Sequence, residues 1–303
     1  MDRMTSVHTS WPMLSAAAEA TGFTVTAGAT PYTRCLQEAS GQHVAEVGFS
    51  ADLGWYQLGC PFVGQFPQAR RLLQHDFVLA RAGISGAALV LCADLPAAEP
   101  ADLALSLGFW KTDCQTGAAI LAGQADIFFG TTNDEANPEA VPVIEEFLDH
   151  QTQDWFAKKV AIGVWRLSRR PTALPDWPSV AQLVLVGART TLAITGSSPS
   201  GFALPKAVVI ARDLLLLRLN GSRRSTATCL TDHGVVWRAA LPTRGLRPGQ
   251  LDLAWRSVLA TYQVSHSELQ ALTDEALARL YLEMYSDPNI IQEASHENVG
   301  IGH

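Results

Sequence analysis

Two apolar runs in this 303-residue chain end in the same pattern, Ala-x-Leu-Pro. The first run leads into Ala93-Asp94-Leu95-Pro96, and the second leads into Ala239-Ala240-Leu241-Pro242. Proline cannot donate a hydrogen bond to a sheet, and it pushes the residue before it into an extended conformation. Each pattern therefore predicts a strand that ends on a buried leucine, after which the chain leaves the sheet.

The elements expected around the two patterns follow one order: helix, three strands, helix, two strands, helix. The helix after each proline carries apolar residues at i, i+4, i+7 and i+11, which is the spacing of one helix face. These residues are Leu103, Leu107, Trp110 and Cys114 in the first half, and Leu251, Trp255, Val258 and Tyr262 in the second. We predict an α+β fold of two tandem α-β-β-β-α-β-β-α units with antiparallel sheets, arranged as a pseudo-dimer. The alternative is two α+β segments that are alike by accident.

The first unit is expected to span 1–130, and the second, with a C-terminal helical extension, 131–303. Strands are expected at 31–37, 43–50, 55–60, 159–167, 181–187 and 189–195, and helices at 66–75, 138–156 and 206–217. In the C-terminal extension Ser265 and Glu268 have the spacing of a capping box. The apolar stripe there consists of Leu269, Leu272, Ala276, Leu280 and Met284. We expect this stripe to pack across the junction of the two units.

The net charge of −7 is divided unevenly along the chain. Residues 1–150 hold 6 Lys and Arg against 17 Asp and Glu, whereas residues 151–303 hold 16 against 12. An acidic first half argues against nucleic acid as a partner. The chain also lacks an apolar run of about 18 residues and an apolar signal-peptide core, so we expect no membrane contact and a cytoplasmic location. The five cysteines form no Cys-x-x-Cys pair, which favours free thiols.

Motifs that carry catalytic chemistry are missing from the sequence. The stretch Gly196 to Phe202 has the glycine spacing of a phosphate loop, but the lysine that should follow is absent. The eight histidines are scattered, and none forms a His-x-x-x-His pair for zinc. We therefore expect no enzymatic activity, no cofactor and no metal. The alternative is an enzyme whose site is assembled from distant residues.

Neighbouring aromatic residues are the candidates for partner binding. Consecutive side chains of a strand point to opposite faces, so one of Trp55 and Tyr56 is expected to point away from the core. The adjacent Phe109 and Trp110 on a helix raise the same question. Exposed Trp and Tyr are enriched at binding hot spots, so these positions favour partner binding, and burial between the two halves is the alternative. The candidate partner-binding residues are Trp55, Tyr56, Leu58, Phe109 and Trp110.

The order of elements, with an apolar strand running into "LVLCADLP" and then a helix, resembles the type III secretion chaperone-like family of bacteria. The likeness covers 12–122 and 138–263. It implies a non-enzymatic chaperone or adaptor that holds an extended, incompletely folded partner segment against grooves and sheet edges. Members of that family are usually single units that pair as homodimers, so this chain looks like a dimer fused into one monomeric polypeptide. A regulatory or scaffolding module of the same fold, without an export role, is the alternative.

Overall fold

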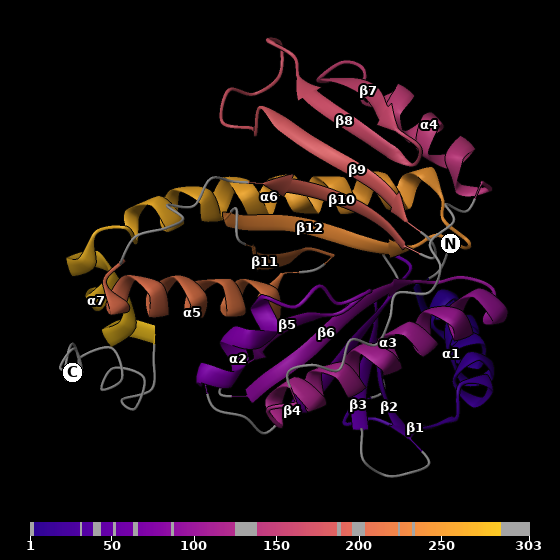
Figure 1. Cartoon of the computed structure of the whole chain (residues 1–303). Coiled ribbons are helices and arrows are strands. Elements are labelled where there is room, and N and C mark those ends of the chain that lie inside the picture. The colour runs from indigo at the N-terminus through magenta and orange to yellow at the C-terminus, as the bar shows by residue number, and fades with distance from the viewer. Residues whose placement is uncertain are drawn as a thin grey trace.

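Residues up to Leu121 form an antiparallel six-stranded sheet with three helices, which we call the first unit (Figure 1). The computed structural model describes residues 3–30, 32–38, 44–50, 53–62, 66–85, 88–124, 138–186, 189–195, 204–223, 225–231 and 234–285. The elements of the first unit are α1 (Arg3–Ala20), β1 (Phe23–Ala27), β2 (Thr33–Glu38), β3 (Val44–Ser50), β4 (Trp55–Phe62), α2 (Phe66–Leu73), β5 (Arg81–Ser85), β6 (Ala88–Pro96) and α3 (Pro100–Leu121).

The residues from Ala140 onward form the second unit, which has its own antiparallel six-stranded sheet. Its elements are α4 (Ala140–His150), β7 (Trp155–Ala161), β8 (Val164–Arg169), β9 (Val180–Val186), β10 (Arg189–Thr195), α5 (Lys206–Ser222), β11 (Ala227–Thr231), β12 (Gly234–Pro242), α6 (Pro248–Ala271) and α7 (Glu275–Tyr285). The fold is thus α+β, with seven helices and two six-stranded sheets in the described ranges. The expected boundary at 130/131 and the glycine-rich stretch 196–202 lie outside the described residues.

The two sheets have the same strand order when each is read from its first strand. The first runs β1-β2-β3-β4-β6-β5, and the second runs β7-β8-β9-β10-β12-β11. The registers also agree, because Pro96 lies opposite Trp55 in β4 just as Pro242 lies opposite Arg189 in β10. Each position of one sheet therefore has a counterpart in the other.

Each unit contains one strand more than the sequence predicts. In the first unit β1 was not expected, and in the second the predicted strand 159–167 is a hairpin of β7 and β8. The hairpin turns at Gly163, whose φ of 70° lies in the left-handed region that glycine adopts without strain. The expected helix 138–156 is also too long, because α4 ends at His150 and Trp155 already begins β7.

The Ala-x-Leu-Pro patterns end β6 and β12, as predicted. Both strands stop at the proline, and Leu95 and Leu241 are buried. A helix then begins at a second proline, Pro100 or Pro248, whose missing N–H costs nothing in a first helical turn. These helices, α3 and α6, return along their own sheets.

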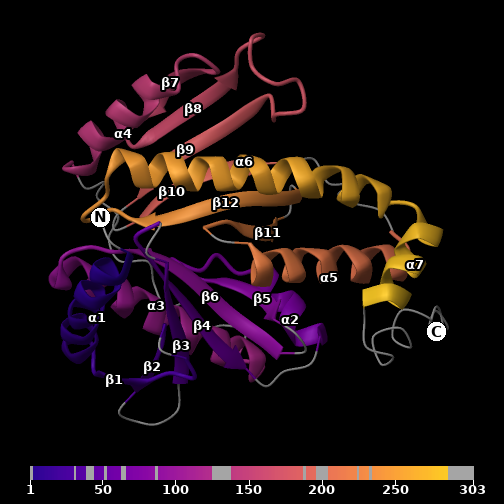
Figure 2. The ribbon, with the colours of Figure 1, turned by 180° about the vertical axis from the view of Figure 1, so that it is seen from behind.

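In each unit, a pair of the unit's own helices covers one face of its sheet, and we call the other face helix-free. In the first unit α1 packs on α3, which lies on β6, and in the second unit α4 packs on α6, which lies on β10 and β12. Figure 1 shows α3 in front of its sheet and α6 behind its sheet, and Figure 2 shows the reverse. The helix-free faces of the two sheets therefore point to opposite sides of the molecule.

The units meet where the end of α5 lies against β5. The two backbones approach so closely that a Cβ on Gly221 would overlap the carbonyl oxygen of Ile84, and one on Gly83 would overlap the Gly221 backbone. Asn220 closes the inner edges of both sheets there: its Nδ2 donates to the carbonyl oxygens of Ala82 (2.8 Å) and Thr228 (3.0 Å). A second contact joins the loop before β5 to the other sheet, where Phe77 and Asp76 bind arginines of β10 and β12.

The C-terminal helices differ from the expectation in two ways. Helix α6 continues through Ser265, which is no cap: its hydroxyl donates to the carbonyl oxygen of Thr261 (2.6 Å) and accepts from the Trp237 indole (2.7 Å). Helix α7 packs on α5 within the second unit, at the far end from the junction (Figure 1). The predicted stripe is wrong, because Leu280 and Met284 are 51% and 62% exposed while Ala278 and Leu282 are buried.

Candidate partner-binding surface

Four of the five predicted partner-binding residues lie in the core. Trp55, Tyr56, Leu58 and Trp110 are each at most 3% exposed, and Phe109 is half-buried against the core. Their side chains therefore offer no free aromatic surface to a partner, which corrects the prediction. The expectation failed because it assumed solvent on one face of each element, whereas both faces of β4 are covered at its first residues.

Trp55 is covered by the second unit. It lines a small space at the junction together with Arg81 and Asp94 of its own unit and Thr226 and Leu241 of the other. Its neighbour Tyr56 points to the opposite face and donates its hydroxyl hydrogen to the carbonyl oxygen of Ser10 (2.6 Å). Burial raises the pKa of Tyr56 to about 12, so the phenol stays protonated and keeps this hydrogen bond. For Trp55, burial between the two halves is what the structure shows.

A groove that is open to solvent lies over the helix-free face of the sheet of the first unit. Its volume is about 810 Å³. The C-terminus of α5 closes its inner end. We call this feature the open groove, and it is lined by Ala29, Thr33, Cys35, Glu46, Gly48, Gln57, Leu58, Gly59, Pro61, Arg81, Ser85, Ala88, Val90, Cys92, Asp94, Gly221, Ser222 and Arg223.

Two glycines form the floor of the open groove. In the register of the sheet, Gly48 of β3 lies opposite Gln57 of β4, and Gly59 of β4 lies opposite Glu46 of β3. A Cβ at Gly59 would meet nothing within 4 Å, and one at Gly48 would meet only the Gln57 side-chain oxygen. Glycine in the interior of a strand weakens the sheet and marks places where a ligand or another backbone approaches closely. We call Gly48 and Gly59 the glycine floor.

A row of side chains crosses the floor from one strand to the next. Cys35 lies opposite Glu46, Glu46 opposite Gly59, Gly59 opposite Cys92, and Cys92 opposite Arg81. Burial raises the pKa of the Cys92 thiol, so it is protonated near neutral pH and is a poor nucleophile. The row therefore places the Glu46 carboxylate, the protonated Cys92 thiol and the Cys35 side chain around a bare backbone.

The inner end of the open groove is fixed by a buried ion pair. Arg81 Nη1 lies 2.6 Å from Asp94 Oδ2, and the two side chains are 8% and 4% exposed. The same carboxylate oxygen accepts from the backbone N–H of Ser225 (2.7 Å), and Arg81 Nε donates to the carbonyl oxygen of Asn220 (2.9 Å). These bonds hold the end of α5 over β5 and β6, so the rim of the groove belongs to the second unit.

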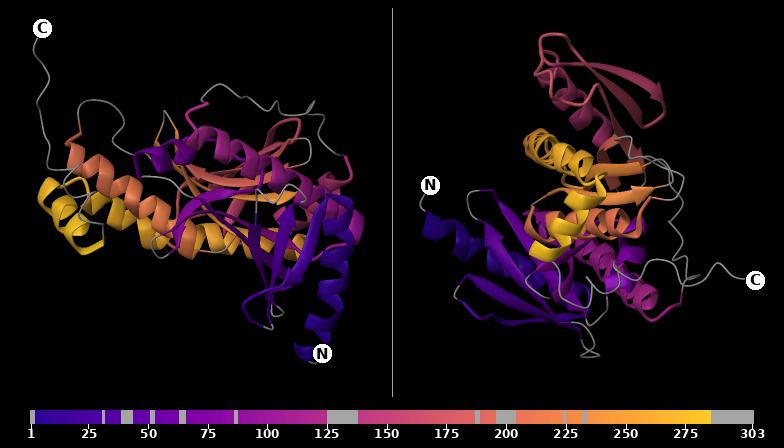
Figure 3. Two further views of the ribbon diagram at one scale, coloured as in Figure 1. Left: turned by 90° about the horizontal axis from the view of Figure 1, so that it is seen from below. Right: turned by 90° about the vertical axis from the view of Figure 1, so that its left-hand side faces the viewer.

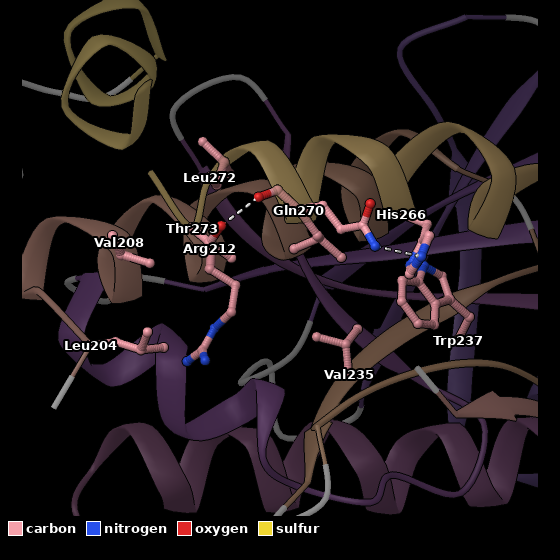
Figure 4. A pocket seen from close by; sticks show the side chains of 10 residues that line it. Leu204, Val208, Arg212, Val235, Trp237, His266, Gln270, Leu272 and Thr273 are labelled. Atoms are coloured by element: carbon pink, nitrogen blue, oxygen red, sulfur yellow. Dashed lines mark hydrogen bonds between the residues drawn. The ribbon is translucent and has the colours of Figure 1, made fainter. Parts of the chain in front are cut away.

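A second, apolar cavity lies in the other unit between α5, β12 and the last turns of α6 (Figure 4). Its volume is about 50 Å³, with Trp237 and His266 at one end and Leu204 and Val208 at the other. The His266 ring nitrogen is hydrogen-bonded to the Gln270 amide (3.2 Å). Arg212 also lines the cavity, but its guanidinium is bound to Asp213 (2.9 Å).

Metal-ligating side chains are not gathered anywhere in the described ranges. No three of the His, Cys, Asp and Glu side chains placed there are grouped so that they could hold an ion. No helix in the same ranges is long and apolar enough to cross a membrane. The candidate site is therefore defined by shape and charge.

Sequence reasoning missed the open groove, although one signal was present. Gly48 and Gly59 interrupt expected strands at positions where a strand gains stability from a side chain, and no turn residue lies beside them. The pairing that makes them one floor depends on the register of β3 and β4, which the sequence did not give. In comparisons with known proteins, no family model matches the chain, and no curated protein or solved structure is significantly similar to it.

Proposed function

We propose that the chain is a non-enzymatic chaperone or adaptor in which two copies of one unit are fused as a dimer. In this proposal the open groove of the first copy holds an extended segment of a partner protein. The observation that carries the proposal is the glycine floor, a bare stretch of sheet under a groove of about 810 Å³. The residues that line the groove come from five neighbouring strands, β2 to β6, so it lies open across the sheet and suits an extended chain segment.

The fused-dimer part of the proposal is supported by the junction. By strand order and register, α2 corresponds to α5 and β5 to β11. Helix α5 lies on β5, helix α2 touches β11, and the corresponding pairs α2–α5 and β5–β11 touch each other. In a two-fold dimer interface, an element of one copy contacts a second element of the other copy, and the reverse contact is also made. The contacts between these corresponding elements follow that pattern. The six-stranded sheets differ from the five-stranded units expected from the resemblance to type III secretion chaperones, so an export role is proposed only as one form of the adaptor function.

The proposal is tested by selecting a phage-displayed library of random 15-residue peptides against the full chain. Selected peptides are then synthesised with a fluorescent label, and their Kd is measured by anisotropy. Gly59→Val fills the floor where nothing lies within 4 Å, so the variant should fold while losing at least tenfold in affinity. Ala193→Val, at the corresponding position of β10, is the matched control and should bind as the wild type does. Equal affinities of the wild type and Gly59→Val would refute the open groove as the binding site.

The regulatory or scaffolding alternative predicts a different preference. A chaperone binds a segment that is extended and unfolded, whereas a scaffold binds a folded partner surface. To separate the two, a selected peptide is fused to a carrier protein, and the fusion is unfolded in urea and then diluted into the binding assay. An affinity equal to that of the free peptide would favour the chaperone. Binding only when the peptide is held in a folded carrier would favour the scaffold.

A further inference from the structure

Two charged side chains remain without an opposite charge in the open groove. Asp94 and Arg81 neutralise each other. Among the described residues, neither the Glu46 carboxylate on β3 nor the Arg223 guanidinium at the end of α5 has an ion-pair partner, and both side chains are exposed. The groove thus carries a negative charge on its floor and a positive charge at its inner rim.

The strand order gives the spacing of the backbone positions that carry these two charges. Glu46 lies on β3, and Arg223 adjoins β5, since its carbonyl oxygen accepts from Arg81 Nη2 (2.9 Å). From β3 the sheet continues through β4 and β6 to β5. Three steps of about 4.8 Å separate β3 from β5, roughly 14 Å, which an extended chain covers in about four residues.

We propose that the occupant of the open groove is an extended protein segment with a basic and an acidic residue about four positions apart. The inference rests on the proposed function and names the class of partner. The basic residue lies over Glu46 and the acidic residue near Arg223, and the residues between them lie over Gly59 and Cys92. Nucleic acid is a poor occupant, because Glu46 in the middle of the floor repels phosphate.

The test uses two labelled ten-residue peptides of identical composition, built from Ser and Val with one Lys and one Glu. In one peptide Lys and Glu are four positions apart, and in the other they are adjacent. Anisotropy titrations with the full chain should show at least fivefold tighter binding of the spaced peptide at low salt. The preference should disappear in Glu46→Gln and in Arg223→Gln. Both side chains are exposed, so we expect both variants to fold, and thermal melts check this.

Three outcomes separate this inference from the function on which it rests. Equal Kd values for the two peptides on the wild type would overturn the spacing rule. A preference that survives in both variants would overturn the assignment of the charges to Glu46 and Arg223. If library peptides still lose affinity on Gly59→Val in either case, the proposed function stands and only the inference falls.

Discussion

The helix-free faces of the two sheets share one register but have different chemistry. Where the first has Gly48 and Gly59, the second has Val184 and Ala193. The row Cys35, Glu46, Gly59, Cys92 of the first sheet corresponds to Arg166, Gln182, Ala193, Arg238 of the second. One face is thus bare and acidic, and the other carries side chains and is basic, so the same backbone arrangement presents two chemically different faces.

The two ends of the junction differ in the same way. At the first sheet, Asp94 receives the backbone N–H of Ser225 from the opposite unit. At the second sheet, the charges are reversed: Arg189 and Arg238 bind Asp76 of the opposite unit. Asp113 of α3 supports this contact by accepting three backbone N–H bonds of 2.8–2.9 Å from residues 78–80. Each sheet therefore binds a loop of the other unit. The first sheet uses a negatively charged side chain for this contact, and the second sheet uses positively charged ones.

The strongest test of this comparison is Asp94→Ala, which gives the first sheet the residue found at the corresponding position Ala240 of the second. Removing one partner of a buried ion pair leaves an uncompensated charge, so we expect the free energy of unfolding to fall by about 3–5 kcal/mol. Urea denaturation followed by tryptophan fluorescence measures this change. A loss below about 1 kcal/mol would show that Arg81 is adequately solvated without Asp94.

A smaller effect is expected from Gly221→Ala, which tests the close approach of α5 and β5. The added methyl group would overlap the Ile84 carbonyl, and overpacking of this kind costs about 1–3 kcal/mol. Gly108→Ala is the matched control, because that helical glycine of α3 faces open space and should gain roughly 0.5–1 kcal/mol instead. Changes of the same sign in both variants would contradict the close approach at the junction.

The acid sensitivity of the second contact should be detectable through Asp76. Burial works to raise the pKa of Asp76, but the charges of Arg238 and Arg189 outweigh it and hold the pKa below its usual value. A carboxyl group whose pKa is lower in the folded protein than in the unfolded chain, where it is about 3.9, stabilises the folded state above that pH. This stabilisation is lost as the pH falls through the pKa of the folded state. The stability difference between the wild type and Asp76→Asn should therefore be present at pH 7 and shrink below about pH 4. A difference that stays constant from pH 7 to pH 3 would contradict this assignment.

The smallest effect sharpens the comparison of the two faces. Gly59→Val gives the first face a side chain, as the second has at Ala193, and Val suits a strand better than glycine. We expect the variant to gain up to about 1 kcal/mol in unfolding free energy while losing peptide affinity. The reverse change, Ala193→Gly, should cost stability without creating binding. A Gly59→Val variant that is less stable would show that the floor is needed for folding.

The sequence predicts the parts of the fold that buried side chains mark. Leu95-Pro96 and Leu241-Pro242 end their strands as expected, since proline acts locally. Strand β1 was not predicted because it is an edge strand with exposed Thr24 and Thr26. The β7–β8 hairpin was predicted as a single strand because apolar residues continue up to Gly163. The open groove was beyond sequence patterns for a physical reason: its floor consists of missing side chains, and its rim comes from residues far along the chain. The candidate aromatic residues failed because the second unit covers the face of β4 that carries Trp55.

The unequal lengths of α5 and α2 have a consequence for the number of peptides that the proposed site would bind per chain. Helix α5 has 17 residues and α2 has 8, so α5, whose end forms the rim over the first sheet, is the longer of the two corresponding helices (Figure 3). A homodimer would have to place the same helix on both sides. In the proposed function the open groove of the first sheet is the binding site, so peptide binding should saturate at one peptide per chain.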